Sequence, residues 1–257
     1  MPIGQDEEVQ NQRRIFCFYE TQLSVTLQCQ VTTNEALQND VRRLVLSLPT
    51  AASYHAGQYL SLSVGERAFP FSIANAPGGQ HLELHIKATE DSADSALIEQ
   101  FLNDHPSSVT IEYPLGQCFL SHVPAQPVIF IAAATGITQI KSMFDWLTAQ
   151  PDAQTVHVYW GVVTPDDLYL DDYFKAATAD ANITYTPVVS HDDKTWAGRV
   201  GLVGDAVHED FKNLNDHLIF VSGSPGMVYG TLDRLTAKGF DPKNMRSDVF
   251  DYAPRSA

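Results

Sequence analysis

Apolar and polar residues alternate along the first half of the chain, from about residue 22 to about residue 122. This alternation, with many β-branched residues, is typical of half-buried strands. It predicts strands at residues 23–33, 41–48, 58–64, 82–88 and 108–115. A helical pattern interrupts them at 92–105, with Ser92 or Asp94 as the candidate N-cap. Several short strands with one helix predict a small antiparallel β-barrel.

Strand and helix patterns alternate in the second half, which predicts a parallel sheet covered by helices. The apolar runs cover 127–134, 155–162, 183–190 and 217–224, and the helical patterns that follow them cover 138–150, 170–180, 201–211 and 226–239. We therefore divide the chain into an N-terminal tail (1–21), a barrel domain (22–123) and an α/β domain with a C-terminal aromatic tail (124–257). Ligands bind such sheets at the carboxyl ends of the strands.

The charge of the chain limits its partners. Its 31 Asp and Glu residues outnumber its 16 Lys and Arg residues, for a net charge of −15. Nucleic acid and anionic membrane surfaces require basic patches, so we expect neither. A phosphorylated small ligand remains compatible, because backbone N–H groups at a helix start bind phosphate. No apolar run approaches the ~18–20 residues of a membrane span, and the acidic start is not a secretory signal. We expect a cytoplasmic protein.

Cysteines and histidines predict no metal site. Cys17, Cys29 and Cys118 lie far apart and form no C-x-x-C pair. Their odd number and spacing predict no disulfide framework and no zinc or iron–sulfur cluster. The nine histidines show no H-E-x-x-H spacing.

The segment "AAATGIT" (132–138) is the first candidate for binding chemistry. An apolar strand ends there in small residues and a helical pattern begins. Small side chains let a pyrophosphate approach the backbone, Thr135 offers a hydroxyl, and the helix start near Thr138 adds free N–H groups. The alternative is tight packing without a ligand. The standard G-x-G-x-x-G fingerprint is absent.

Small residues also end the last strand, in "SGSPGM" (222–227). Gly223 and Gly226 permit unusual backbone angles and Pro225 stiffens the turn. An ordinary strand–helix loop would look the same. Two such loops at one sheet edge favour a shared ligand that is long enough to touch both.

Two aromatic segments complete the candidate site. In "FPFSIANAP" (69–77) a proline inside a strand pattern marks an edge or a bend, and Phe71, Ser72 and Asn75 would suit a flat heteroaromatic ring. In "SDVFDY" (247–252) we expect Phe250 and Tyr252 to alternate on a short strand. Each segment is equally compatible with core packing.

Taken together, in this order and spacing, these segments make the chain similar to the bacterial NAD(P)H:flavin oxidoreductases, members of the ferredoxin–NADP reductase superfamily. The likeness covers roughly residues 24–252 and is greatest to general flavin reductases and those of luminous bacteria. It also includes "AGQYLSLSV", "LELHIKA", "YPLGQCFL", "VYWGV" and "YTPVVS…WAGRVG". Each block alone is weak evidence for this family, but the whole set is specific to it.

The resemblance implies the roles of individual residues. Ser72 is expected near flavin N5, the atom that accepts hydride, and is the candidate catalytic residue. The candidate cofactor-binding residues are Phe69, Pro70, Phe71, Ser72, Ile73, His85, Ile86, Lys87, Ala134, Thr135, Gly136, Ile137, Thr138, Gly223, Ser224, Pro225, Met227, Phe250 and Tyr252. Pro70, Phe71, Ser72 and Ile73 would line the flavin. Thr135, Gly136 and the block from Gly223 to Met227 would face the nicotinamide nucleotide, and Phe250 and Tyr252 would close the flavin site.

Three departures from the family pattern qualify these roles. Many members carry an arginine where this chain has Phe69, and a phenyl ring cannot form a charge-assisted bond to a flavin phosphate. Weakly held FMN, riboflavin or FAD is therefore expected in place of tightly held FAD. Arg67 lies close in sequence, but strand alternation would aim it elsewhere. Ala133-Ala134 replace a double glycine, and Ser222 replaces a cysteine.

The resemblance implies that hydride passes from nicotinamide C4 to flavin N5 across the interdomain cleft. Loops after the second and third sheet strands read "GVVTPDD" and "SHDDKTW", with only Lys194 nearby. An NADPH 2′-phosphate usually meets Arg or Lys, so we expect NADH to be preferred over NADPH. Without a four-cysteine iron–sulfur segment, electrons would leave as reduced flavin or pass to another protein.

Three functions remain open at this stage. The first is an NADH-dependent flavin reductase that releases reduced flavin to a monooxygenase, a luciferase or a ferric acceptor. The second is a reductase that keeps FAD or FMN bound and serves a protein acceptor. The third is a non-catalytic nucleotide-binding regulatory protein, which the combination of Ser72, the "ATG" turn and the aromatic tail disfavours. Monomer and homodimer are both compatible with the sequence.

Overall fold

The first sheet of the fold is antiparallel and curled. The computed structural model describes residues 23–88, 92–191 and 194–255, so the predicted tail at 1–21, including Cys17, lies outside the described residues. The sheet has the strand order β4-β3-β6-β1-β2-β5, and its two edge strands approach each other. Its strands are β1 (Val25–Ala36), β2 (Arg42–Ser47), β3 (Tyr59–Val64), β4 (Arg67–Ser72), β5 (His81–Ile86) and β6 (Ser108–Leu115).

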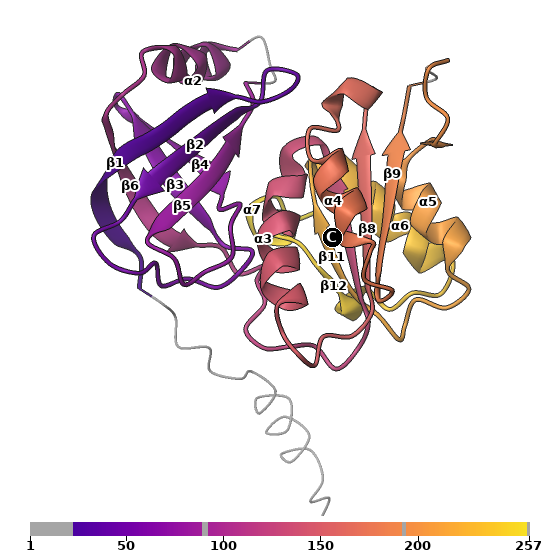
Figure 1. The fold of residues 1–257 in the computed structure, drawn as a ribbon. Helices are drawn as coiled ribbons and strands as arrows, with labels where there is room; N and C mark the ends of the chain where they lie inside the picture. Colours follow the sequence, from indigo (N-terminus) through magenta and orange to yellow (C-terminus); the bar gives the residue numbers. More distant parts are fainter. Residues whose placement is uncertain (1–22, 89–91, 192–193, 256–257) are drawn as a thin grey trace, which may run out of the picture.

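The curled sheet encloses its own apolar core. Alternate side chains of a strand point to one face, which places residues such as Leu60 and Leu62 in the fully buried interior. Helix α2 (Ala93–Asn103) packs its apolar face against this core and covers one end of the sheet (Figure 1). Its N-cap is Ser92, whose hydroxyl oxygen accepts from the Ser95 N–H at 3.2 Å. The predicted barrel is confirmed as a curled, partly open form.

The second sheet is parallel and has helices on both faces, as predicted. Its order is β10-β9-β8-β7-β11-β12. Its strands are β7 (Val128–Ala133), β8 (Val156–Val162), β9 (Ile183–Val189), β10 (Arg199–Val200), β11 (Leu218–Ser222) and β12 (Met245–Arg246). The α-helices are α3 (Ile137–Thr148), α4 (Asp171–Ala177), α5 (Val203–Asp210), α6 (Pro225–Ala237) and α7 (Val249–Tyr252), and the 3-10 turns are η1 (Ala134–Gly136), η2 (Pro165–Asp167) and η3 (Pro242–Asn244).

Burial on both faces explains the continuous apolar runs of this sheet. Phe130 and Trp160 pack towards α3 and α4, whereas Ile129 and Ile131 pack towards α5 and α6. Figure 1 shows these two helix layers on opposite sides of the strands. All central strands run in the same direction, so their carboxyl ends meet at one edge.

The predicted strand at the C-terminus is wrong. Only Met245 and Arg246 pair with β11, and the chain then turns into the short helix α7. The Tyr252 N–H donates to the Asp248 carbonyl oxygen at 3.2 Å. Val249 and Phe250 pack against the α5 and α6 layer. A six-residue segment is too short for its apolar spacing to separate a helix turn from a strand.

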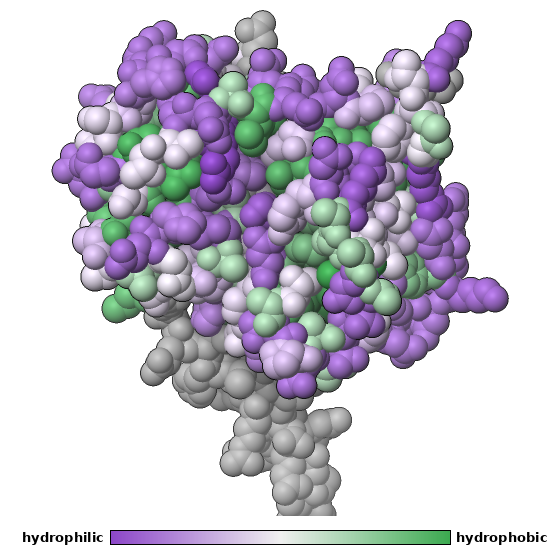
Figure 2. All heavy atoms as spheres, viewed as in Figure 1, coloured by the Kyte–Doolittle hydropathy of each residue, from purple (hydrophilic) through white to green (hydrophobic). Residues whose placement is uncertain are grey.

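Helix α3 holds the two sheets together. Gln139 Nε2 donates to the Gly57 carbonyl oxygen at 2.8 Å, and Ser142 Oγ donates to the Asn75 carbonyl oxygen at 2.7 Å. On the face shown in Figure 2, polar residues cover most of the surface and apolar residues appear in scattered patches. No helix within the described residues has the length and apolar character needed to cross a bilayer.

Candidate active site

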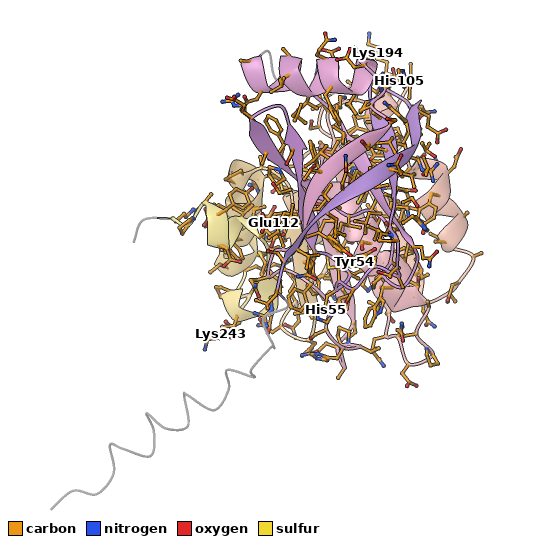
Figure 3. The ribbon with its side chains drawn as sticks, turned by 90° about the vertical axis from the view of Figure 1, so that its left-hand side faces the viewer. Tyr54, His55, His105, Glu112, Lys194 and Lys243 are labelled. Carbon is orange, nitrogen blue, oxygen red and sulfur yellow. The ribbon has the colours of Figure 1, made fainter. Side chains whose placement is uncertain are left out.

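A cavity of about 390 Å³ lies where the two sheets meet, and we call it the interdomain cavity. Figure 3 looks onto the antiparallel sheet and shows the C-terminal segment in yellow beside it, on the side where Glu112 is labelled. The cavity is lined by Tyr59, Pro70, Ser72, Gln139, Ser222, Gly223, Ser247, Asp248, Val249 and Tyr252. Elements from both halves of the chain therefore build one site.

The barrel side of this cavity is an edge strand, as the proline in β4 predicted. Pro70 lies opposite Ser61, and Ser72 lies opposite Tyr59, on the adjacent strand β3. Residues two apart on a strand share a face, which explains why Pro70 and Ser72 line the cavity together. Phe69 and Phe71 take the other face and pack against the barrel core.

The opposite wall contains a half-buried carboxyl group, Asp248. Its Oδ1 accepts from the Cys118 N–H at 3.1 Å, and its Oδ2 accepts from Gln139 Nε2 at 2.7 Å. Burial raises the pKa of Asp248 above its usual range, against the opposing effect of these hydrogen bonds. A carboxyl group that retains a proton more readily thus lies in the same cavity as the Ser72 hydroxyl.

Sequence reasoning missed Asp248, Gln139 and Tyr59. Asp248 stands inside the quoted segment "SDVFDY", where attention fell on the aromatic residues. Gln139 sits in the first turn of α3, and a glutamine on a helical pattern gives no signal of its own. Tyr59 lies on an ordinary barrel strand, and only its pairing with Ser72 brings it to the cavity.

A second cavity, of about 340 Å³, lies along the carboxyl edge of the parallel sheet, and we call it the sheet-edge groove. Its lining comes from the ends of β7, β8 and β9 and from α5 and α6. The residues are Ala133, Ala134, Gly161, Val162, Val163, Ser190, Gly201, Leu202, Val203, Gly204, Gly226, Met227, Gly230, Thr231 and Arg234. The lining is mainly apolar and rich in glycine, which suits a ligand that contacts backbone.

The small residues of "AAATGIT" serve packing as well as approach. A Cβ added to Gly136 would come within 2.4 Å of the Ser222 carbonyl oxygen, so glycine is needed for the two loops to touch. A Cβ added to Gly226 would meet nothing within 4 Å, so this glycine opens onto the groove. Ala134 lies in the groove wall with φ of 48°, a left-handed angle uncommon for alanine. Close packing is therefore present at Gly136, and Gly226 leaves open space where a ligand could approach.

The interdomain cavity and the groove share a wall at Gly223. A Cβ added to Gly223 would come within 2.3 Å of Met227 Cε and 3.1 Å of Ala133 Cβ, two residues of the groove lining. Gly223 itself lines the interdomain cavity. Two ligands, one in each hollow, would meet at Gly223.

Several predicted site residues line neither hollow. Ile73, Ile86 and Ile137 are buried in the cores. His85 is buried between Glu83 and the Tyr169 hydroxyl. The others have these positions: Lys87 pairs with Asp167, Thr138 is buried beside Tyr169, Phe250 packs on Tyr229, and Thr135, Gly136, Ser224 and Pro225 belong to the two turns without lining either hollow.

A third cavity, of about 660 Å³, has a lining that shares no residue with the interdomain cavity or the groove. It is bounded by Gln38 and Asn39, by residues of the β8–α4 connection such as Asp166, and by Asp171 and Asp172 at the start of α4. None of the predicted site residues lines it. No group of three or more potential metal-binding side chains occurs within residues 23–88, 92–191 and 194–255.

The two hollows fit the two cofactors that the resemblance implies. Pro70, Val249 and two tyrosines give the interdomain cavity flat apolar walls, and Ser72 and Asp248 give it polar groups, a combination suited to a flavin ring. Open glycine backbone along the groove suits a dinucleotide. The fit rests on chemistry and shape in this chain.

Comparison with known proteins agrees with the site. Residues 130–233 match the oxidoreductase NAD-binding domain family. A cytochrome P450 reductase from Amycolatopsis has a TM-score of 0.76 at 24% identity, over 88% of this chain and 69% of its own. A ferredoxin NADP+ reductase from Neisseria gonorrhoeae, solved with bound FAD and NADP, has a TM-score of 0.71 at 17% identity, over 87% and 98%. These structures show that this chain has the ferredoxin reductase-like fold, and the family match adds an oxidoreductase NAD-binding domain.

Sequence relatives narrow this class. A probable flavin reductase of Photobacterium leiognathi is 33% identical over 87% of this chain and 98% of its own. The NAD(P)H-flavin reductase of Vibrio harveyi is 30% identical over 89% and 100%. A CDP-6-deoxy-L-threo-D-glycero-4-hexulose-3-dehydrase reductase of Yersinia pestis is 34% identical over 88% and 69%. The chain belongs to the flavin reductase family.

Proposed function

We propose that this protein is an NADH-dependent flavin reductase that takes flavin as a substrate and releases it reduced. The observation that carries the proposal is the shared wall at Gly223, which joins a ring-sized cavity holding Ser72 to a nucleotide-type groove. With both ligands bound, the nicotinamide supplies a hydride to the flavin. The protein contributes alignment, because hydride transfer needs donor and acceptor in contact.

Each lining residue has a definite task in this arrangement. Ser72 offers a hydroxyl on the barrel side, and Asp248 offers a carboxyl group able to hold a proton on the other. Tyr252 is 65% exposed at the cavity mouth, where its ring can cover a bound flavin. Gly223 leaves room for two rings to approach.

Charge supports release of the flavin. Within residues 23–88, 92–191 and 194–255, no Lys, Arg or His lines the interdomain cavity. Burial, and then the carboxylates of Asp248, Asp251 and Glu112, raise the pKa of the Tyr59 phenol. Arg67 is engaged by Asp94 beside α2. A flavin phosphate would find no cation in this lining, which supports weak binding of FMN, riboflavin or FAD.

The decisive test is NADH oxidation by purified protein with and without added FMN. Strict dependence on added flavin, saturating with its concentration, is the expected result. Oxidation by a yellow protein without added flavin would contradict release. It would favour a bound prosthetic flavin that serves a protein acceptor.

The proposed preference for NADH rests on the acidic loop that follows β8, whose end lines the groove. The β8–α4 connection carries Asp166 and Asp167, and the Lys87 ammonium is already paired with Asp167 at 3.0 Å. We expect kcat/KM to be higher with NADH than with NADPH. A preference of about tenfold for NADPH, or 1.4 kcal/mol, would contradict this. In the proposed function, the reduced flavin that is released passes to a monooxygenase or a ferric acceptor.

A further inference from the structure

Among the described residues that line the sheet-edge groove, Arg234 is the only charged one. Arg234 follows Pro225, the first residue of α6, by nine positions, which places it about 14 Å along the helix axis. The start of α6 adjoins Gly223 and the interdomain cavity. Arg234 therefore lies in the part of the groove away from the reacting rings, where the adenosine half of a dinucleotide would extend.

Asp205 of helix α5 occupies this guanidinium. Arg234 Nε donates to Asp205 Oδ1, and Arg234 Nη1 donates to the Gly230 carbonyl oxygen at 3.4 Å. Asp205 lies in the first turn of α5, where the helix dipole stabilises a carboxylate. The positive charge of the Arg234 guanidinium is thus already neutralised by the Asp205 carboxylate.

Close packing of the two helices keeps this pair together. A Cβ added to Gly204 would come within 2.8 Å of Thr231 Oγ1, so α5 and α6 touch at the level of the pair. The Arg234 side chain lines the groove and is 39% exposed, so a ligand there can reach it, and the Asp205 side chain paired with it is 44% exposed. The packing of α5 on α6 thus fixes the position of the Asp205–Arg234 pair, and the pair also remains accessible to solvent.

These contacts have opposite consequences for the two nicotinamide nucleotides. A 2′-phosphate near Arg234 would have to compete with Asp205 for the guanidinium and lie beside a like charge. The 2′-hydroxyl of NADH can instead donate to a carboxylate, as ribose hydroxyls do in many dinucleotide sites.

We propose that the Asp205–Arg234 pair sets the choice between NADH and NADPH: Arg234 contacts the adenosine end of the nucleotide, and Asp205 is the positioning residue that withholds its charge from a 2′-phosphate. The proposal rests on the proposed function for its substrate. It goes beyond it by assigning selectivity to two residues on α5 and α6, outside the acidic loops.

The test compares Asp205→Asn with a matched control. Asparagine keeps the shape of the side chain and removes its charge. Asp233→Asn makes the same change one residue before Arg234, in a pair where Arg255 donates to Asp233 at 2.7 and 2.8 Å outside the groove lining. Two quantities are measured: the ratio of kcat/KM for NADPH to that for NADH, and the affinities for 2′,5′-ADP and 5′-AMP by calorimetry.

Asp205→Asn should raise the kcat/KM ratio and the relative affinity for 2′,5′-ADP by about tenfold, the size of one charge-assisted hydrogen bond. Asp233→Asn should change neither by more than about twofold. In Asp205→Asn/Arg234→Gln the gain should vanish, which shows that it acts through Arg234. Equal changes in Asp205→Asn and Asp233→Asn would overturn the proposal.

Two further outcomes are informative. If Asp205→Asn does not fold, Arg234→Gln alone carries the test, and unchanged 5′-AMP affinity in that variant overturns the proposal. If the wild-type protein reduces no flavin but its 2′,5′-ADP affinity responds to Asp205→Asn as expected, the proposed function fails and the selectivity role stands. Calorimetry of nucleotide fragments needs no flavin turnover, which separates the two failures.

Discussion

Ser72 is positioned by a strand edge, and this determines what its hydroxyl can do. It ends β4, the edge strand of the curled sheet, and faces the interdomain cavity with Pro70. Its neighbours Phe71 and Ile73 are directed into the barrel core, so the backbone at Ser72 is fixed by packing on either side. The hydroxyl can therefore stay aligned without a binding partner of its own.

Ser72→Ala tests this role, and we expect kcat for flavin reduction to fall by about tenfold to a hundredfold, because one aligned polar contact is lost. The free energy of unfolding should change by less than about 0.5 kcal/mol, since no core contact is removed. Stopped-flow measurement of NADH-dependent FMN reduction gives the first quantity and urea unfolding the second.

Ser61→Ala is the control for this experiment. Ser61 lies on β3, opposite Pro70 of β4. Like Ser72 it is part-buried, but it does not line the interdomain cavity. Turnover by Ser72→Ala equal to that of Ser61→Ala would remove the hydroxyl from the mechanism.

Among the elements, the turns after β7 and β11 determine the site. Gly136 in η1 lies against the carbonyl group of Ser222, and Gly223 lies against Ala133 and Met227. These contacts bring the ends of two neighbouring parallel strands together, and the groove and the cavity open on either side. The small residues at this sheet edge therefore have a structural role before any ligand binds.

Gly136→Ala should lower the free energy of unfolding by about 1–3 kcal/mol, because the added methyl group overlaps a backbone carbonyl that cannot easily move. Gly226→Ala is the matched comparison. Its Cβ meets nothing within 4 Å, and alanine favours the helix, so the melting temperature should hold or rise. Nucleotide affinity should nevertheless fall, because the methyl group enters the groove. Equal melting temperatures for Gly136→Ala and wild type would contradict the packing role.

At the scale of the whole molecule, a buried polar network ties the barrel to the α/β half. His85 of β5 lies between Glu83 and Tyr169, at 3.0 and 3.2 Å. Arg43 donates to the other carboxylate oxygen of Glu83 at 2.8 Å. Burial alone would raise the pKa of Glu83, but hydrogen bonds from His85 and Arg43 outweigh it and lower the pKa to about 2.

This pKa shift predicts a defined dependence of stability on pH. The folded-state pKa of Glu83 lies below its unfolded value near 4.5, so its contribution is present above about pH 4.5 and is lost as the pH falls towards 2. The shift corresponds to roughly 3 kcal/mol in the free energy of unfolding. Glu83→Gln should therefore destabilise the protein most at neutral pH, and its difference from wild type should shrink below pH 4.5.

Urea unfolding at a series of pH values measures this difference. Glu35→Gln is the control, because Glu35 also pairs with Arg43 but is exposed, and it should have little effect at any pH. A Glu83→Gln difference that is constant from neutral to acid pH would contradict the network.

The candidate site could be predicted from the sequence only in part. The sequence blocks that carry the resemblance include residues of both hollows. Pro70, Ser72, Gly223 and Tyr252 line the interdomain cavity, and Met227 lines the groove. The same blocks include residues whose side chains alternate away from the ligand. A contiguous block contains both faces of a strand, and only the tertiary structure distinguishes them.

Local pattern by itself predicted the antiparallel sheet, the parallel sheet and the four helices that follow its strands, and for the proline of β4 it left a sheet edge or a bend open. Periodicity, turn residues and proline act over a few neighbouring positions, so the chain alone contains them. The tertiary structure decided the turn of the tail into α7, the placement of the half-buried Asp248 in the same cavity as Ser72, and the pairing of Asp205 with Arg234 of the groove lining. The last two join residues distant in sequence, and their chemistry arises from burial and proximity that exist only once the sheets and helices have packed.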